Sequence, residues 1–410
     1  MRERRQSSRN QNHVEKQSRR REEDDEPKES DRAFARVSFA LYADTGFSQS
    51  SEPILIGVHL DQAKQASYYS LLQKDAIDLF TKELNEKGGI SGRPVKILYE
   101  DDENNPVTTA TKVDKLAAAG VSYIVSIGSS ATGLATQARA GELKIAHGAP
   151  ANLAEALTTN PPKPYYFRIP LRGKYELQAI GQYLHKKYGK PKLAVVRDAT
   201  QTGLVISDQW ITDLKKDGFD IVAVEQITPG STEATGQALR VKESKADVVI
   251  VCGASIPDLA NYIKAHKLFG NSAPLIGNSL FTSGGFLKLA GPAAEGFVYP
   301  DAVDPSRPEI KDIEARFAKA YGERMRNQAV ALQAYEYMRL VANAIGRAGS
   351  DDRQKIRDAM EATKDWPIAI GPPGTKLSYG PDNHDLFTSA DQVVLRMVKD
   401  GEFGPALEWR

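Results

Sequence analysis

From residue 54 onward, short runs of apolar and β-branched residues alternate with longer stretches in which apolar residues recur at helical spacing. The first run precedes a helical stretch that ends near Gly88. The next run, residues 95–100, precedes a helix with Asn105 as its N-cap and Pro106 at its first position. Strands that alternate with helices in this way are typical of parallel sheets covered by helices. The pattern therefore predicts an α/β fold.

The alternation runs along the chain twice. The first series of alternating strand and helix patterns ends near residue 150. After an extended stretch at residues 163–170, a second series continues to about residue 298. Long helical patterns follow, and two strand-like runs come last. A chain of 410 residues is longer than a single hydrophobic core usually supports. The pattern therefore predicts two similar, doubly wound, Rossmann-like lobes.

Composition narrows the classes of function. The chain has 54 basic and 53 acidic residues, so its net charge of +1 provides no field that would favour nucleic acid or an anionic membrane. No stretch approaches the roughly 20 apolar residues that span a bilayer. We therefore expect no nucleic-acid partner and no direct membrane contact.

The sequence offers little for a metal or a cofactor. Cys252 is the only cysteine, so no internal disulfide and no thiolate metal site is expected, and its apolar surroundings indicate a small buried residue. His59 and His147 lie near expected strand ends. Two histidines without carboxylates at ligand spacing are interpreted as polar lining or packed residues. We expect no metal and no cofactor.

The N-terminal segment departs from the pattern. Residues 1–32 are almost entirely polar, and their arginines are followed at once by an acidic run, which is typical of a disordered tail. Residues 33–50 are mildly apolar but are interrupted by Arg36 and Asp44 and show no clear secretion signal. We expect residues 1–52 to form a disordered or atypical tail. Either the protein stays in the cytoplasm or the assigned start obscures a leader.

The stretch SIGSSATGLA, residues 126–135, lies between a strand-like run and a helical one and resembles two enzyme motifs. Gly128 and Gly133 have the spacing of a phosphate loop, but Leu134 stands where that loop needs lysine. Around Ser130 the stretch resembles a nucleophile elbow, but Thr132 replaces the second flanking glycine. Both enzyme interpretations fail at a residue that the chemistry requires.

Three longer stretches, taken together, carry a family resemblance: NEKGGISGRPVKILYEDDENNP (85–106), LVISDQWITDLKKDGFDIVAVEQITPGST (204–232) and LAGPAAEGFVYPDA (289–302). In this order and spacing the chain resembles the leucine/isoleucine/valine-binding type of periplasmic solute receptor, which delivers ligands to ABC importers. The resemblance implies a binding protein rather than an enzyme. Its partners would be a small-molecule ligand and the importer's permease subunits, with membrane contact only through the importer.

The resemblance also implies how the lobes are divided. Three hinge strands near residues 168, 298 and 380 would join them, and the ligand would lie between them. Lobe 1 would comprise residues 53–168 and 299–380, and lobe 2 would comprise residues 169–298 and 381–410.

The family's ligand contacts can be carried over one position at a time. Ser130 matches a serine that binds the ligand's carboxylate, Ala151 matches an alanine that contributes its backbone, and Tyr69 matches an aromatic residue over the ligand side chain. Leu153, with Asn152 beside it, replaces a threonine donor. Thr202 and Ala254 replace two tyrosines, and Ser279 replaces the acid that pairs with the ligand's ammonium group. With Ser129 from the same turn, the candidate binding residues are Tyr69, Ser129, Ser130, Ala151, Asn152, Thr202, Ala254 and Ser279.

Of these replacements, the serine at position 279 has the strongest implication for the chemistry of the ligand. Enclosing an ammonium group without a paired acceptor costs several kcal/mol, so such a site disfavours α-amino acids unless another acid replaces the missing one. We therefore expect another organic acid or an amide, with an amino acid held differently as an alternative. Two other functions stay open: a cytoplasmic amide or amino-acid sensor of the same fold, and a serine hydrolase. The hydrolase would need a histidine and an acid that converge on Ser130.

Overall fold

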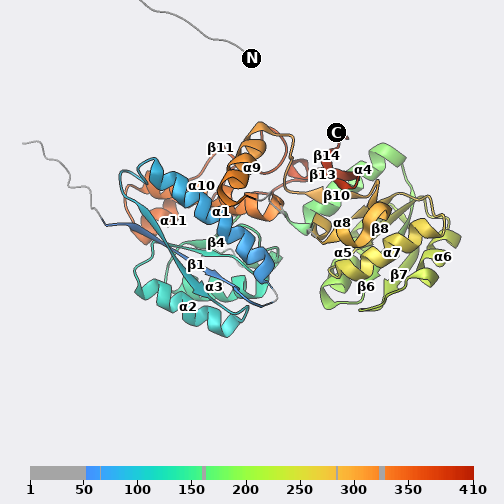
Figure 1. Ribbon diagram of the computed structural model, residues 1–410, viewed down its shortest axis with the longest axis horizontal. Coiled ribbons are helices and arrows are strands. Elements are labelled where there is room, and N and C mark those ends of the chain that lie inside the picture. Colours follow the sequence, from blue (N-terminus) through green and yellow to red (C-terminus); the bar gives the residue numbers. More distant parts are fainter. Residues whose placement is uncertain (1–51, 65, 159–162, 283–284, 323–327) are drawn as a thin grey trace, which may run out of the picture. The chain divides into compact units, whose positions relative to one another are not determined.

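The computed structural model describes residues 52–64, 66–158, 163–282, 285–322 and 328–410 (Figure 1). The predicted tail of residues 1–52 lies outside this part of the chain except for Glu52. No helix within the described residues is long and apolar enough to cross a membrane.

The first sheet has five parallel strands in the order β2-β1-β3-β4-β5. Its strands are β1 (Ile54–Leu60), β2 (Val95–Asp101), β3 (Tyr123–Ser126), β4 (His147–Ala149) and β5 (Tyr166–Arg168). The helices that follow its first three strands are α1 (Ser67–Glu86), α2 (Pro106–Ala118) and α3 (Ser130–Glu142), drawn in blue to cyan in Figure 1. The side chains of Ile56, Val58, Tyr123 and Val125 are fully buried in its core.

Local sequence signals explain where these helices begin and end. Asn105 caps α2: its side chain accepts hydrogen bonds from the backbone N–H groups of Val107 at 2.9 Å and Thr108 at 3.1 Å. Pro106, which has no N–H to leave unpaired, is the first helical residue. Helix α1 ends at Glu86, and Gly88 follows with a φ of +96° that favours glycine. These predictions are confirmed.

The second sheet has seven strands in the order β14-β13-β10-β9-β8-β6-β7. Its parallel strands are β6 (Lys192–Asp198), β7 (Asp220–Ile227), β8 (Val248–Cys252), β9 (Leu275–Gly277) and β10 (Val298–Asp301). Two antiparallel strands extend it, β13 (Val394–Lys399) and β14 (Glu402–Ala406). Its helices are α4 (Gly173–Tyr188), α5 (Gln201–Lys216), α6 (Thr235–Glu243), α7 (Ile256–Leu268) and α8 (Phe286–Ala290).

The remaining elements lie mostly in the C-terminal part of the chain. The long helix α10 (Gln328–Ala348) packs on α1, and α11 (Arg353–Glu361) packs on α10, so both belong with the first sheet. Helix α9 (Pro308–Tyr321) also contacts α1. The other short elements are β11 (Trp366–Pro367), β12 (Lys376–Leu377), η1 (Glu155–Leu157), η2 (Ser279–Thr282), η3 (Gly291–Ala294) and η4 (Ala390–Gln392).

The chain passes between the two sheets three times: after β5, after β10 and before β13. Two Rossmann-like lobes with a three-strand connection are thus confirmed as the fold. The lobe boundaries themselves stay a prediction. Sheet membership supports the first at residue 168, whereas β10 lies in the second sheet to its end and places the second crossing after Asp301.

The cap of α2 provides a first test. Replacing Asn105 with alanine removes the acceptor of two backbone N–H groups, and we expect the free energy of unfolding to fall by about 1 kcal/mol. Val107→Ala, which changes an exposed residue of the same helical turn, should change it by less than about 0.5 kcal/mol. Urea unfolding measures both, and equal effects would show that the cap contributes nothing specific.

Candidate functional site

Each sheet contains a point at which the connections from two neighbouring strands leave in opposite directions. In the first sheet these strands are β1 and β3, and in the second they are β6 and β8. In open α/β sheets, ligands bind beyond the carboxyl ends of such strands. Ser129 and Ser130 follow β3, Thr202 lies in the first turn of α5 after β6, and Ala254 follows β8. The predicted residues therefore lie where this topology favours a site.

At the first sheet, the start of α3 and the loop after β4 form one polar cluster. Ser129 is the N-cap of α3, and its side chain accepts the N–H of Thr132 at 3.4 Å. Ser130 Oγ accepts the backbone N–H of Ala154 at 3.2 Å, which leaves the Ser130 hydroxyl hydrogen available to an acceptor. Among the described residues, the backbone N–H groups of Ser130 and Ala131 have no hydrogen-bond partner. This cluster can bind an oxygen-rich anionic or polar group.

Asn152 explains one glycine of the apparent phosphate loop. Its side chain is buried, its Nδ2 donates to Ser126 Oγ at 3.2 Å, and within the described residues its Oδ1 has no partner. A Cβ at Gly133 would lie 2.2 Å from Asn152 Nδ2. The close approach of the neighbouring loop therefore explains why position 133 is a glycine, without a bound phosphate. The same loop places Ala151 directly after Pro150, at the end of β4.

Tyr69 lies in the first turn of α1, and 37% of its surface is exposed. Its ring meets that of Tyr68 edge to face, with 5.3 Å between the ring centroids. The turn is preceded by a loop in which Asp61 accepts the backbone N–H groups of Ala63 at 3.1 Å and Ala66 at 2.7 Å. This geometry leaves Tyr69 accessible, but its role as an aromatic cover stays a prediction.

At the second sheet, the buried carboxylate of Asp198 holds two strand-end loops together. It accepts the backbone N–H groups of Thr200 at 2.9 Å, Ala254 at 2.6 Å and Ser255 at 2.8 Å. A Cβ at Gly253 would lie 2.0 Å from Asp198 Oδ2, so only glycine admits this approach. The sequence reasoning missed Asp198, which fixes the backbone positions of Thr200 and Ala254.

Ser279 begins η2 after β9 and contacts an acid that the sequence reasoning also missed. Its Oγ donates to Glu176 Oε1 at 2.6 Å, and its backbone N–H donates to Glu176 Oε2 at 3.1 Å. Burial raises the pKa of Glu176 above its ordinary value, although both bonds from Ser279 lower it, and the nearby Asp301 raises it further. A carboxylate from another element, α4, therefore lies beside the position that lacks an acid in the sequence comparison.

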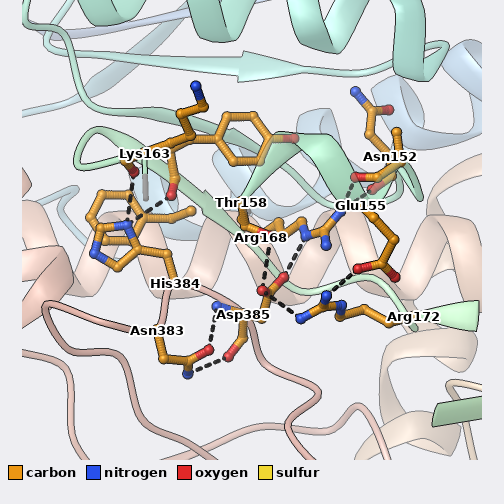
Figure 2. A network of polar contacts seen from close by, with 12 residues as sticks. Asn152, Glu155, Thr158, Lys163, Arg168, Arg172, Asn383, His384 and Asp385 are labelled. Carbon is orange, nitrogen blue, oxygen red and sulfur yellow. Dashed lines mark hydrogen bonds and ion pairs between the residues drawn. The ribbon is translucent and has the colours of Figure 1, made fainter. Parts of the chain in front are cut away.

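A charged network ties the loop after β4 to the first and third crossings (Figure 2). Arg168, fully buried at the end of β5, forms an ion pair with Asp385, and its Nη1 donates to the carbonyl of Ala154 at 2.6 Å. Arg172 also reaches Asp385, with 3.2 Å between Nη1 and Oδ2, and forms an ion pair with Glu155. The position of the Asn152 loop is therefore coupled to the connecting segments.

Among the described residues, no histidine forms a hydrogen bond with Ser130, as a serine hydrolase would need. His59 is fully buried, with Nδ1 2.6 Å from Asp102 Oδ2 and Nε2 2.6 Å from Thr136 Oγ1. Thr136 also donates to the carbonyl of Thr132 inside α3 and is itself buried. The arrangement ties β1, the loop after β2 and α3 together, and it matches the interpretation of His59 as a packed residue.

Neither cysteine nor metal chemistry gains support. Cys252 is buried in β8, and burial raises the pKa of its thiol to about 12, which suppresses the reactive thiolate. Within the described ranges, no three His, Cys, Asp or Glu side chains are grouped so that they could hold a metal ion.

The sequence profile of the family described as periplasmic binding protein matches residues 53–401. The match covers most of the 410 residues, so the chain belongs to the periplasmic binding protein family. This is a family of substrate-binding proteins rather than of enzymes, and the resemblance seen in the sequence is confirmed.

Individual relatives agree with this assignment. The chain is 27% identical over 345 residues to Leu/Ile/Val-binding protein homolog 1 of Brucella melitensis. The aligned region covers 82% of this chain and 90% of that protein. The isoleucine complex of LivJ, a branched-chain amino acid transporter substrate binding protein from Streptococcus pneumoniae, has a TM-score of 0.72 at 20% identity and covers 87% of this chain and 99% of LivJ.

A third relative binds a different kind of molecule. The solute binding protein of an ABC transporter from Rhodopseudomonas palustris, solved with 3,4-dihydroxy benzoic acid, has a TM-score of 0.69 at 20% identity and covers 87% of this chain and 96% of that protein. At such identities the two structural comparisons show the fold alone.

The role of Asp198 can be measured. Asp198→Ala leaves three backbone N–H groups without their acceptor, and at about 1 to 3 kcal/mol for each unpaired buried group we expect a loss of about 3 kcal/mol or more of unfolding free energy. Asp208→Ala, which removes an exposed carboxylate paired with Arg197, should cost about 0 to 1 kcal/mol. A loss below 1 kcal/mol for Asp198→Ala would mean that the two loops hold their positions without this carboxylate.

The buried ion pair provides a second measurement. Asp385→Ala leaves Arg168 buried without its countercharge, and we expect a loss of about 3 to 5 kcal/mol in a denaturant titration. The double variant Arg168→Met with Asp385→Leu removes both charges and should recover at least half of that loss. If the double variant is no more stable than Asp385→Ala, the unpaired charge is not the cause.

Proposed function

We propose that the protein is an extracytoplasmic solute-binding receptor. It captures a small ligand that carries a carboxylate or amide group between its two lobes and delivers that ligand to an ABC importer. Membership of the periplasmic binding protein family supports the receptor role. The description of that family supports the periplasm as location, and the names of structural relatives, which include a solute binding protein of an ABC transporter, support the importer as partner.

One observation at the first sheet supports a carboxylate or amide group on the ligand. The Ser130 hydroxyl already accepts the N–H of Ala154, so it is oriented to donate, and the free N–H groups of Ser130 and Ala131 lie beside it at the positive end of α3. Three such donors suit a carboxylate or a carbonyl oxygen. The ligand would therefore be held at this end by Ser129, Ser130, Ala151 and Asn152, with Tyr69 beside them.

The second sheet would complete the enclosure. Thr202, Ala254 and Ser279 follow three strands that are neighbours in the sheet, in the order β9-β8-β6. A ligand that contacts both sets of loops favours a closed arrangement by its higher affinity for that state. An importer that recognises the closed state would thereby receive loaded receptor.

A thermal-shift panel of amino acids, aliphatic amides and aromatic acids tests the receptor role, because a ligand at ~100 times its Kd adds about 2.7 kcal/mol of stability. For the ligand found, Ser130→Ala should weaken binding by about 1 to 3 kcal/mol in calorimetric titration, because a donor to a buried polar group is lost. Ser350→Ala removes a hydroxyl that likewise accepts a backbone N–H near a helix start, and it should leave the affinity unchanged.

The role of Ser130 and the receptor role can be contradicted separately. Unchanged affinity in Ser130→Ala would remove Ser130 from the site while leaving the receptor role intact. Absence of any stabilisation across the panel, or turnover of a panel compound by the purified protein, would contradict the receptor role itself.

A further inference from the structure

Glu176 lies in the first turn of α4, and only 4% of its surface is exposed. Both of its carboxylate oxygens face Ser279, at the carboxyl end of β9, where one accepts the side-chain hydroxyl and the other the backbone N–H. The acid is thus placed at the same edge of the second sheet as the candidate binding residues Thr202, Ala254 and Ser279.

The hydrogen bonds from Ser279 satisfy only part of this carboxylate. An ionised carboxylate has about four acceptor positions, and Ser279 fills two of them. Within the part of the chain that the structure describes, no lysine, arginine or histidine forms an ion pair with Glu176. The nearby Asp301 differs, because its Oδ2 lies 2.5 Å from Arg396 Nη1. A buried carboxylate without a cation is costly to keep charged, so its remaining acceptor positions call for a positively charged partner.

We propose that Glu176, oriented by Ser279, receives a protonated amino group of the ligand. This inference rests on the proposed receptor function and narrows it. The ligand would carry an amino group in addition to the carboxylate or amide that the first sheet holds, as α-amino acids and their amides do. It revises the expectation from sequence that the missing acid at position 279 disfavours amino acids.

Matched pairs of ligands test this on the unaltered full-length protein. L-leucine is compared with 4-methylpentanoate, and L-phenylalanine with 3-phenylpropanoate, because the members of each pair differ mainly in the amino group. We expect the amino member of a binding pair to bind at least about 30-fold more tightly in calorimetric titration, the lower range for a desolvated charge pair. A desamino acid that binds as tightly as its amino partner would overturn the proposal.

Two variants separate recognition from a structural role. Glu176→Gln keeps the shape but loses the charge, so it should weaken the amino ligand by about 30-fold or more while leaving the affinity for the desamino acid unchanged or improved. Glu336→Gln makes the same change at another buried helical glutamate, which accepts the N–H of Ala369, and should leave both affinities unchanged. A Glu176→Gln variant that binds the amino ligand with unchanged affinity contradicts the proposal.

The outcomes also distinguish this inference from the receptor function. If an organic acid or amide without an amino group binds tightly and no amino compound does, the inference about Glu176 fails and the receptor function stands. If nothing in the wider panel binds, the receptor function fails and the inference with it.

Discussion

The ion pair between Arg168 and Asp385 sets the geometry on which the rest of the candidate site depends. A fully buried guanidinium costs several kcal/mol unless its charge and its N–H groups are satisfied, and here the partners come from two different segments. Asp385 belongs to the third crossing, and the carbonyl of Ala154 belongs to the loop after β4. Because Arg168 needs both, that loop and the crossing must hold compatible positions, and Asn152 is fixed along with them.

The polar groups at the strand ends differ between the two sheets. At the first sheet, a helix start with serine hydroxyls and free N–H groups provides donors. At the second sheet, buried carboxylates dominate, and their surroundings differ. Asp198 accepts three backbone N–H groups, one from the loop after β6 and two from the loop after β8, so its role is structural. Among the described residues, Glu176 has Ser279 as its only hydrogen-bond donor, so acceptor positions of its carboxylate stay unfilled there. Donors at one sheet and acceptors at the other match the proposed ligand, which carries both an acid or amide group and an amine.

Most of the fold follows from the sequence because its signals are local. Alternating apolar patterns gave the strands and helices, and Asn105, Pro106 and Gly88 marked their ends. The site is harder to predict, because its chemistry joins residues far apart in the chain. Comparison position by position correctly finds no acid at Ser279, yet the carboxylate beside it comes from Glu176, and nothing in the pattern of α4 reveals that contact. Likewise, the spacing of Gly133 resembles an enzyme motif, whereas the packing of Asn152 against it cannot be seen in the sequence.

The position of Glu176 also links ligand charge to the connecting segments. Arg168 ends β5, Arg172 is the N-cap of α4, and Glu176 lies in the first turn of the same helix. One short stretch therefore contains both the arginines that bind Asp385 and the acid that faces Ser279. A cation bound at Glu176 changes the charge in the first turn of α4. The N-cap of this helix, Arg172, is bound by Asp385 of the third crossing. Since a ligand shifts a conformational equilibrium only through different affinities for its states, a contact in this stretch is well placed to make those affinities differ.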